Sequence, residues 1–139
     1  MIILASDHAG FLLKEDIKKF FKNENITTID VGAYNQDPVD YPDFAKAANA
    51  KVLENENNIG IYICGSGIGM SMAANRNPKI RAASCQTVQF ANLARRHNNA
   101  NVLVLAGRFT NKIKAIRIIK EFLTTEFDGG RHIKRLRKL

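Results

Sequence analysis

The sequence predicts an α/β protein, a three-layer α/β/α, Rossmann-like domain with a five-stranded parallel sheet. Two observations lead to this prediction. Five short apolar runs with strand character are each followed by a segment in which apolar residues recur at helical spacing. Strands and helices that alternate in this way form a parallel sheet whose two faces are both covered. The length of 139 residues suits one domain, residues 1–139, with a full hydrophobic core.

The first half of the chain contains three of these strands. Helices are indicated by apolar side chains every three or four residues, and loops by proline and glycine. The expected segments are a strand at Met1–Ser6, a turn at Asp7–Gly10, a helical pattern over Phe11–Phe21, a strand at Ile26–Val31, a proline-punctuated loop at Tyr34–Pro42, a helix at Asp43–Leu53 and a strand at Ile59–Cys64.

The second half repeats the alternation and ends in a basic segment. After a glycine-rich loop, a helix stops near Asn77-Pro78. The remaining expected segments are a strand at Ile80–Cys85, a helix at Thr87–His97, a strand at Val102–Ala106, a helix at Lys112–Glu126 and, beyond the hinge Gly129-Gly130, a basic C-terminal tail at 131–139. No internal repeat interrupts this order.

The composition is that of an ordinary soluble protein, with 45% apolar and 24% charged residues. The apolar runs are too short to cross a bilayer, so no membrane association is expected. The N-terminus lacks the basic start and long apolar region of a signal peptide. Cys64 and Cys85 are therefore expected to be free thiols in a cytoplasmic protein.

The net charge of +8 is unevenly distributed along the chain. Residues 131–139 contribute five of these charges and contain no acid, so the remainder is only mildly basic. A nucleic-acid-binding domain more often carries basic residues along a whole face. A local cluster fits a small phosphorylated ligand at least as well, and no nucleic-acid partner is expected.

The loop after the third strand is the most informative segment. The apolar strand ends on Cys64, and Gly65, Gly67 and Gly69 follow at alternate positions. A strand, a glycine turn and a helix start present several backbone N–H groups to one small volume, which suits an anion or a developing negative charge. The spacing matches neither the dinucleotide fingerprint nor the P-loop. A tight turn beside a buried cysteine explains the loop equally well.

Polar residues that follow other strands are expected to gather near this loop. Ligands of such folds bind outside the carboxyl ends of the strands, where Asp7, His8 and Arg108 also lie. Asp7 could instead cap the helix that begins near Gly10. The same rule does not place His97 there, and a solvated histidine at a helix end is as plausible as a general acid or base.

Two further classes of site are weakly supported by the sequence. The three histidines and two cysteines show no zinc-type spacing, so no metal site is expected. Ser66 lacks the context of a hydrolase nucleophile.

In the tail, Arg131 and Arg135 would share one face of a helix and could clamp a phosphate, or form a solvated basic end.

Segments along the whole chain resemble the ribose/galactose isomerase family, which includes ribose-5-phosphate isomerase B and the galactose- and allose-6-phosphate isomerases. They occur in family order and are jointly specific, although each is weak alone. The shared segments are Asp7–Gly10, Asp40–Pro42, Ile63–Gly69, Ala73–Asn75, Arg96–Asn98, Asn101–Leu103 and Gly129–His132.

The resemblance implies an aldose–ketose isomerase that interconverts ribose 5-phosphate and ribulose 5-phosphate through an enediolate, without metal or organic cofactor, in the pentose phosphate pathway. It implies that Cys64 is the base that moves a proton between C1 and C2. His97 would open the furanose ring, and Ser66 would assist by hydrogen bonding. Some members have a glutamate at the position of Met70 and lack the cysteine, so this chain resembles the cysteine type.

The resemblance also implies a set of substrate-binding residues. Aspartate, histidine and asparagine side chains would contact the sugar or its phosphate, a tyrosine would wall the pocket, and three arginines would handle the phosphate. The implied set is Asp7, His8, Tyr41, Gly65, Ser66, Gly67, Ile68, Gly69, Asn98, Arg108, Arg131 and Arg135. Family members form homodimers, some paired into tetramers, with the active site at the subunit interface.

Two other functions stay open at this point. A hexose 6-phosphate, such as allose or galactose 6-phosphate, could be the substrate, because pocket length is not readable from the sequence. A non-catalytic phosphosugar- or nucleic-acid-binding protein could use the basic tail. Cys64 together with His97 favours catalysis over binding, because a binding module would need neither.

Overall fold

The computed structural model describes residues 1–139 and contains one sheet of five parallel strands in the order β2-β1-β3-β5-β4. The register is continuous across its centre, where Leu4 pairs with Ile61 and Ile61 with Leu103. The strands are β1 (Ile2–Ser6), β2 (Thr28–Asp30), β3 (Ile59–Cys64), β4 (Ala82–Ser84) and β5 (Val102–Ala106). The predicted fold class is confirmed.

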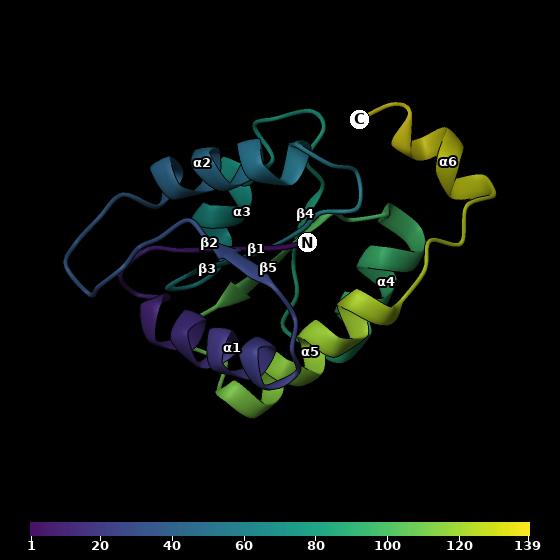
Figure 1. Ribbon diagram of the computed structural model, residues 1–139. Coiled ribbons are helices and arrows are strands. Elements are labelled where there is room, and N and C mark those ends of the chain that lie inside the picture. The colour runs from purple at the N-terminus through teal and green to yellow at the C-terminus, as the bar shows by residue number, and fades with distance from the viewer.

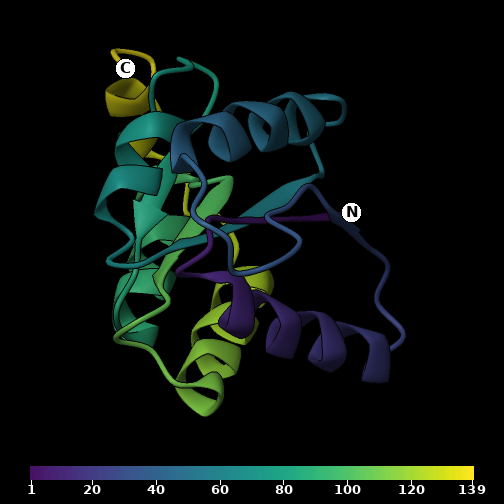
Figure 2. The same cartoon turned by 90° about the vertical axis from the view of Figure 1, so that its left-hand side faces the viewer.

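Helices cover both faces of the sheet, which gives the three predicted layers (Figures 1 and 2). The helices are α1 (Phe11–Asn23), α2 (Tyr41–Leu53), α3 (Ile68–Ala74), α4 (Val88–Asn98), α5 (Lys112–Thr124) and α6 (Arg131–Leu136). α2 and α3 lie on one face, and α1, α4 and α5 on the other. The C-terminal α6, yellow in Figure 1, stands away from this body beside α4. None of the six helices has the length and apolar character that a bilayer crossing requires.

Alternation along the strands builds two separate hydrophobic cores. Ile61 and Ile63 of β3 pack toward α1, α4 and α5, whereas Tyr62 and Cys64 pack toward α2 and α3. The central strands β1, β3 and β5 are buried on both faces. This double burial explains why they appear in the sequence as continuous apolar runs.

Several predicted boundaries differ from the structure by a few residues; the helix after the glycine loop, for example, ends at Ala74 rather than near Asn77-Pro78. β2 and β4 are shorter than the predicted Ile26–Val31 and Ile80–Cys85, because both are edge strands with a neighbour on one side only. α2 begins at Tyr41 rather than Asp43, so part of the predicted loop is helical. Pro42 is tolerated there because the first turn of a helix needs no N–H donor.

The order of the strands places a topological switch point at one edge of the sheet. β1 lies between β2 and β3, and the chain leaves β1 toward α1 but leaves β3 toward α3, on the opposite face. Ligands of open α/β sheets bind where the connections diverge in this way, outside the carboxyl ends of the strands. We call this end the carboxyl edge of the sheet, and the other end the amino edge.

Candidate active site

Close packing of glycines locks three strand ends together at the carboxyl edge. A side chain at Gly10, after β1, would place its Cβ 2.5 Å from the carbonyl oxygen of Ile63. A side chain at Gly107, after β5, would place its Cβ 2.9 Å from the carbonyl oxygen of Ala9. The Gly107 N–H donates to the Cys64 carbonyl oxygen at 2.8 Å. The turns after β1, β3 and β5 therefore meet at one place.

The glycine loop presents backbone donors that the protein itself does not use. Gly67 has φ of +79°, a left-handed conformation that favours glycine, and forms the N-cap of α3. The N–H groups of Gly65, Ser66, Gly67 and Gly69 donate to no acceptor in the protein, whereas the Ile68 N–H bonds the Ser66 Oγ at 3.3 Å. Four free donors in five residues are suited to stabilise negative charge.

The two cysteines lie in different surroundings, and both are free thiols as predicted. Cys64 ends β3 immediately before the glycine loop, with 4% of its surface exposed. Cys85 lies in the core on the other face of the sheet, where burial raises the pKa of its thiol to about 12. Of the two thiols, Cys64 is therefore the one that adjoins the glycine loop.

Asp7 and His8 hold the backbone that follows β1. The Asp7 carboxylate is buried and accepts the Gly10 N–H at 2.9 Å, so it closes the turn ahead of α1 rather than capping the helix itself. The His8 Nδ1 accepts the Val39 N–H at 3.2 Å. This bond leaves Nε2 as the protonated nitrogen of the neutral ring and ties the loop before α2 to the end of β1.

Tyr41 and Arg108 flank the glycine loop on two sides. A Cβ at Gly69 would lie 2.7 Å from Cζ of the Tyr41 ring, so the ring packs directly on the loop. A Cβ at Gly65 would lie 3.5 Å from the Arg108 guanidinium carbon, and the Arg108 N–H donates to the Gly65 carbonyl oxygen at 3.1 Å. We give the name glycine-loop edge to Asp7, His8, Tyr41, Cys64–Gly69 and Arg108.

The other predicted residues form a second group on α4 and α6. The ring of His97 stacks on that of His132, with centroids 4.5 Å apart and planes 12° apart. Burial lowers the pKa of His132, and the positive charges of His97, Arg131 and Arg135 lower it further. The tail is helical, so the two arginines share a face. We call His97, Asn98, Arg131, His132 and Arg135 the α4–α6 end.

One carboxylate joins this group and creates a cluster of metal-ligand type. Asp128 pairs with Arg96 at 3.0 Å, and this pairing lowers the pKa of the carboxyl group. One ligand atom each from His97, Asp128 and His132 lies within 4.8 Å of the others. A metal ion here would compete with Arg96, which binds both carboxylate oxygens, and would have to part the stacked rings.

Within one chain, the two groups lie at opposite ends of the sheet. α4 ends at Asn98, just before β5 begins at Val102 at the amino edge. Cys64 pairs with Ala106 at the carboxyl edge. Six residues of β3 span about 16 Å between the two edges. The structure brings the glycine-loop edge together and keeps His97, Asn98, Arg131 and Arg135 apart from it.

Sequence reasoning missed three side chains that position these groups. His132 and Asp128 lie beside His97. In the sequence, His132 was noted only as part of the Gly129–His132 segment that resembles the family, and Asp128 was not noted at all. Lys14 is fully buried, pairs with Asp30 and donates to the Ala33 carbonyl oxygen at 2.7 Å. It thereby anchors the loop that leads to α2, although its lysine-rich helix gave no sign of burial.

The fold and the glycine-loop edge together define a class of protein. A thiol, four N–H groups without a protein acceptor and an arginine lie together at the carboxyl ends of parallel strands, which is where α/β enzymes bind their ligands. The model of the family described as Ribose/Galactose Isomerase matches residues 2–139, and the chain belongs to this family. The enzyme class implied by the sequence, a sugar-phosphate aldose–ketose isomerase, is confirmed.

Similar proteins cover nearly the whole chain. The structure of a ribose 5-phosphate isomerase B from Thermotoga maritima is 51% identical, with a TM-score of 0.96 over 99% of this chain and 94% of that one. That of ribose-5-phosphate isomerase B from Mycoplasma genitalium with bound ribulose-5-phosphate is 42% identical, with a TM-score of 0.93 over 99% and 91%. Ribose-5-phosphate isomerase B of Escherichia coli is 36% identical over 97% of this chain and 91% of its own.

Proposed function

We propose that the protein interconverts ribose 5-phosphate and ribulose 5-phosphate, a step of the pentose phosphate pathway, with residues 1–139 acting as one isomerase domain. The observation that supports this most directly is the position of Cys64 beside four N–H groups that have no protein acceptor. The Mycoplasma genitalium relative, similar over 99% of this chain, has ribulose-5-phosphate bound in its structure.

The proposed chemistry moves one proton between two carbons. The Cys64 thiolate removes the proton from C2 of the open-chain aldose, and the released electron pair forms the C1–C2 double bond. The carbonyl oxygen at C1 becomes the negative oxygen of an enediolate. The hydroxyl proton at O2 then moves to O1, and Cys64 returns its proton to C1 as the carbonyl forms at C2. Donors from Gly65 to Gly69 stabilise this charge, an effect worth about 3 kcal/mol for each donor removed.

The remaining roles divide between ring opening and phosphate binding. His97 opens the furanose ring, Ser66 assists by hydrogen bonding, and Tyr41 walls the pocket. Asp7, His8 and Asn98 contact the sugar or its phosphate, while Arg108, Arg131 and Arg135 bind the phosphate. Binding energy from this remote group orients the reacting carbons. No metal or organic cofactor takes part in this scheme.

A homodimer is proposed because the two residue groups are separated within one chain. The α4–α6 end of one subunit would meet the glycine-loop edge of its partner and complete the site. Large apolar side chains are exposed around the glycine loop: Ile68 is 57%, Met72 61% and Phe109 74% exposed. Covering them favours association of two copies. The free thiols and the phosphorylated substrate fit a cytoplasmic enzyme.

A substrate panel tests this proposal. Purified protein, dialysed against a chelator, is assayed with ribose 5-phosphate, allose 6-phosphate and galactose 6-phosphate. We expect kcat/KM for ribose 5-phosphate to exceed the other two by about 10²-fold or more, since extra sugar carbons must be fitted between fixed ends of the site. Preference for a hexose phosphate, or activity that disappears with chelation and returns with a metal, would contradict the proposal.

A further inference from the structure

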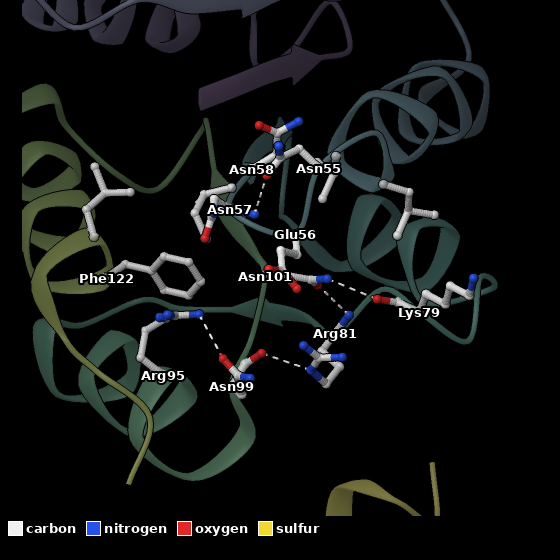
Figure 3. A pocket seen from close by; sticks show the side chains of 14 residues that line it. Asn55, Glu56, Asn57, Asn58, Lys79, Arg81, Arg95, Asn99, Asn101 and Phe122 are labelled. Atoms are coloured by element: carbon white, nitrogen blue, oxygen red, sulfur yellow. Dashed lines mark hydrogen bonds between the residues drawn. The ribbon is translucent and has the colours of Figure 1, made fainter. Parts of the chain in front are cut away.

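A pocket of about 640 Å³ lies at the amino edge of the sheet, opposite to Cys64 (Figure 3). Its walls come from the ends of α2 and α5, from α4, from the turn before β3 and from the segments that lead into β4 and β5. This volume is in the range of small-molecule sites. Its polar lining residues include Glu56, Lys79, Arg81, Arg95, Asn99 and Asn101.

Two arginines are held in place on one asparagine in this pocket. The Arg81 Nε donates to the Asn99 carbonyl oxygen at 2.8 Å, and the Arg95 Nη1 donates to the Asn99 Oδ1 at 3.3 Å, as drawn in Figure 3. Asn99 caps α4 in a left-handed conformation, with φ of +43°. The Arg95 guanidinium also lies 5.5 Å from the centroid of the buried Phe122 ring. The two guanidinium groups are therefore fixed before any ligand arrives.

The positive charges of the pocket have no carboxylate partner. None of the ion pairs of the protein includes Lys79, Arg81 or Arg95. Glu56 is the one acid among the lining residues, and it is exposed and pairs with neither arginine. Burial lowers the pKa of both arginines, and the charge of Arg81 lowers the pKa of Arg95 further. An anion would relieve this repulsion.

Hydrogen-bond donors in the pocket exceed what the protein uses. Arg81 donates only through Nε, so both of its terminal amino groups have no protein acceptor. Arg95 donates through Nε and Nη1, which leaves Nη2 free. The Lys79 ammonium and the Asn99 side-chain amide also donate to no protein group. Guanidinium forks match the several acceptor oxygens and the charge of a phosphate group.

We propose that this pocket binds a small molecule through a phosphate group, at a site separate from the glycine-loop edge. The arginines also support the turn between α4 and β5, because Arg95 donates to the carbonyl oxygens of Ala100 and Thr125. If the arginines served only to support this turn, their remaining N–H donors would bind no ligand. The two roles are distinguished by whether the pocket has affinity for phosphate.

The test is a titration of ¹⁵N-labelled full-length protein with inorganic phosphate at constant ionic strength. We expect the chemical shifts of the Arg81 and Asn101 backbone amides to change in a saturable way. These two residues are coupled, because the Arg81 N–H donates to the Asn101 Oδ1 at 2.8 Å. Arg81→Gln should raise the Kd at these amides by about tenfold, and the exposed Lys79→Gln by about threefold. Arg117→Gln, which removes a charge on α5 away from the pocket, should leave the Kd unchanged.

Residue-resolved shifts separate this site from the proposed catalytic one. Phosphate shifts confined to Gly65–Gly69, or shifts at Arg81 that rise linearly without saturation, would overturn the proposal. Malonate, a dicarboxylate of similar charge, serves as the second ligand. Equal or tighter binding of malonate at Arg81 would overturn the assignment to phosphate. An unchanged Kd for phosphate in Arg81→Gln would also overturn the proposal. If Arg81→Gln does not fold, an unchanged Kd in Lys79→Gln would overturn it instead.

Discussion

The glycine-loop edge and the α4–α6 end are built in opposite ways. The first is made mainly of backbone: glycines at positions 10, 67 and 107 allow strand ends to touch, and four N–H groups of the loop have no protein acceptor. The second is made of charged side chains on two helix surfaces, held by one ring stack and one ion pair. In the proposed mechanism, the first supplies the base and stabilises the enediolate, and the second opens the furanose ring through His97 and binds the phosphate through Arg131 and Arg135.

This difference predicts different kinetic effects for changes in the two regions. An interaction made only in the transition state affects kcat, whereas uniform binding of a remote group affects KM. Changes at the glycine-loop edge should therefore lower kcat, and changes to the arginines of α6 should raise KM. Mutations in each region test this contrast.

The largest effect is expected from Cys64→Ala. Without the base, kcat should fall by about 10³-fold or more, while KM changes little. The matched control is Cys85→Ala, which removes the second thiol from the opposite core and should leave kcat near the parent value. Steady-state kinetics with ribose 5-phosphate measure both. A nearly normal kcat for Cys64→Ala would show that the base is another group.

A smaller loss of kcat is expected from Gly67→Ala. With φ at +79°, a side chain there costs about 1 kcal/mol in backbone strain and turns the loop N–H groups away from the intermediate. We expect kcat to fall about 10- to 100-fold. Gly129→Ala, at φ of +64° before α6, carries similar strain, and its effect should fall on KM. Equal losses of kcat in both variants would remove the contrast between the two regions.

Arg135→Gln should raise KM for ribose 5-phosphate by about tenfold and change kcat by less than about threefold. The reason is that the phosphate lies far from the reacting carbons. Arg137→Gln is the control, because it removes an exposed charge just after the same helix. An unchanged KM for Arg135→Gln would exclude this arginine from the site.

The smallest effect concerns the pH dependence of the α4–α6 end. Because burial and three positive neighbours lower the pKa of His132, the docked α6 disfavours its protonation. Docking of α6 is therefore complete above the ordinary histidine pKa of about 6.5 and weakens as the pH falls below it. In an NMR titration, His132 should titrate at lower pH than an ordinary histidine. His97→Phe keeps an aromatic partner without charge and should raise that pKa; no change would exclude the coupling.

The fold was predictable because its signals are local. The buried strands β1, β3 and β5 each form a continuous apolar run, and their predicted ends agree with the structure to within a residue. The edge strands β2 and β4 were predicted too long, because an apolar run does not show where a single partner strand stops pairing.

The site was predictable in its parts but not in its arrangement. The glycine-loop edge follows from the rule on strand ends, and the structure brings Asp7, Cys64 and Arg108 to one edge. The stack of His97 on His132 depends on how α6 folds back on α4. The two histidines are 35 positions apart in the sequence, so no local sequence pattern predicts their contact. The pocket around Arg81 and Arg95 is equally non-local, since several segments far apart in the chain form it.

Complementation between two inactive variants tests most directly whether the two regions form one site across subunits. Cys64→Ala and His97→Ala chains are expressed together with different tags, and the species that carries both tags is isolated. Each hybrid dimer then has one site with an intact glycine-loop edge and an intact α4–α6 end, so about half of the parent activity is expected. A hybrid of Cys64→Ala and Gly67→Ala, both altered in the same region, should stay nearly inactive. Failure of the first hybrid to exceed the activity of its two parents would contradict a site shared between subunits.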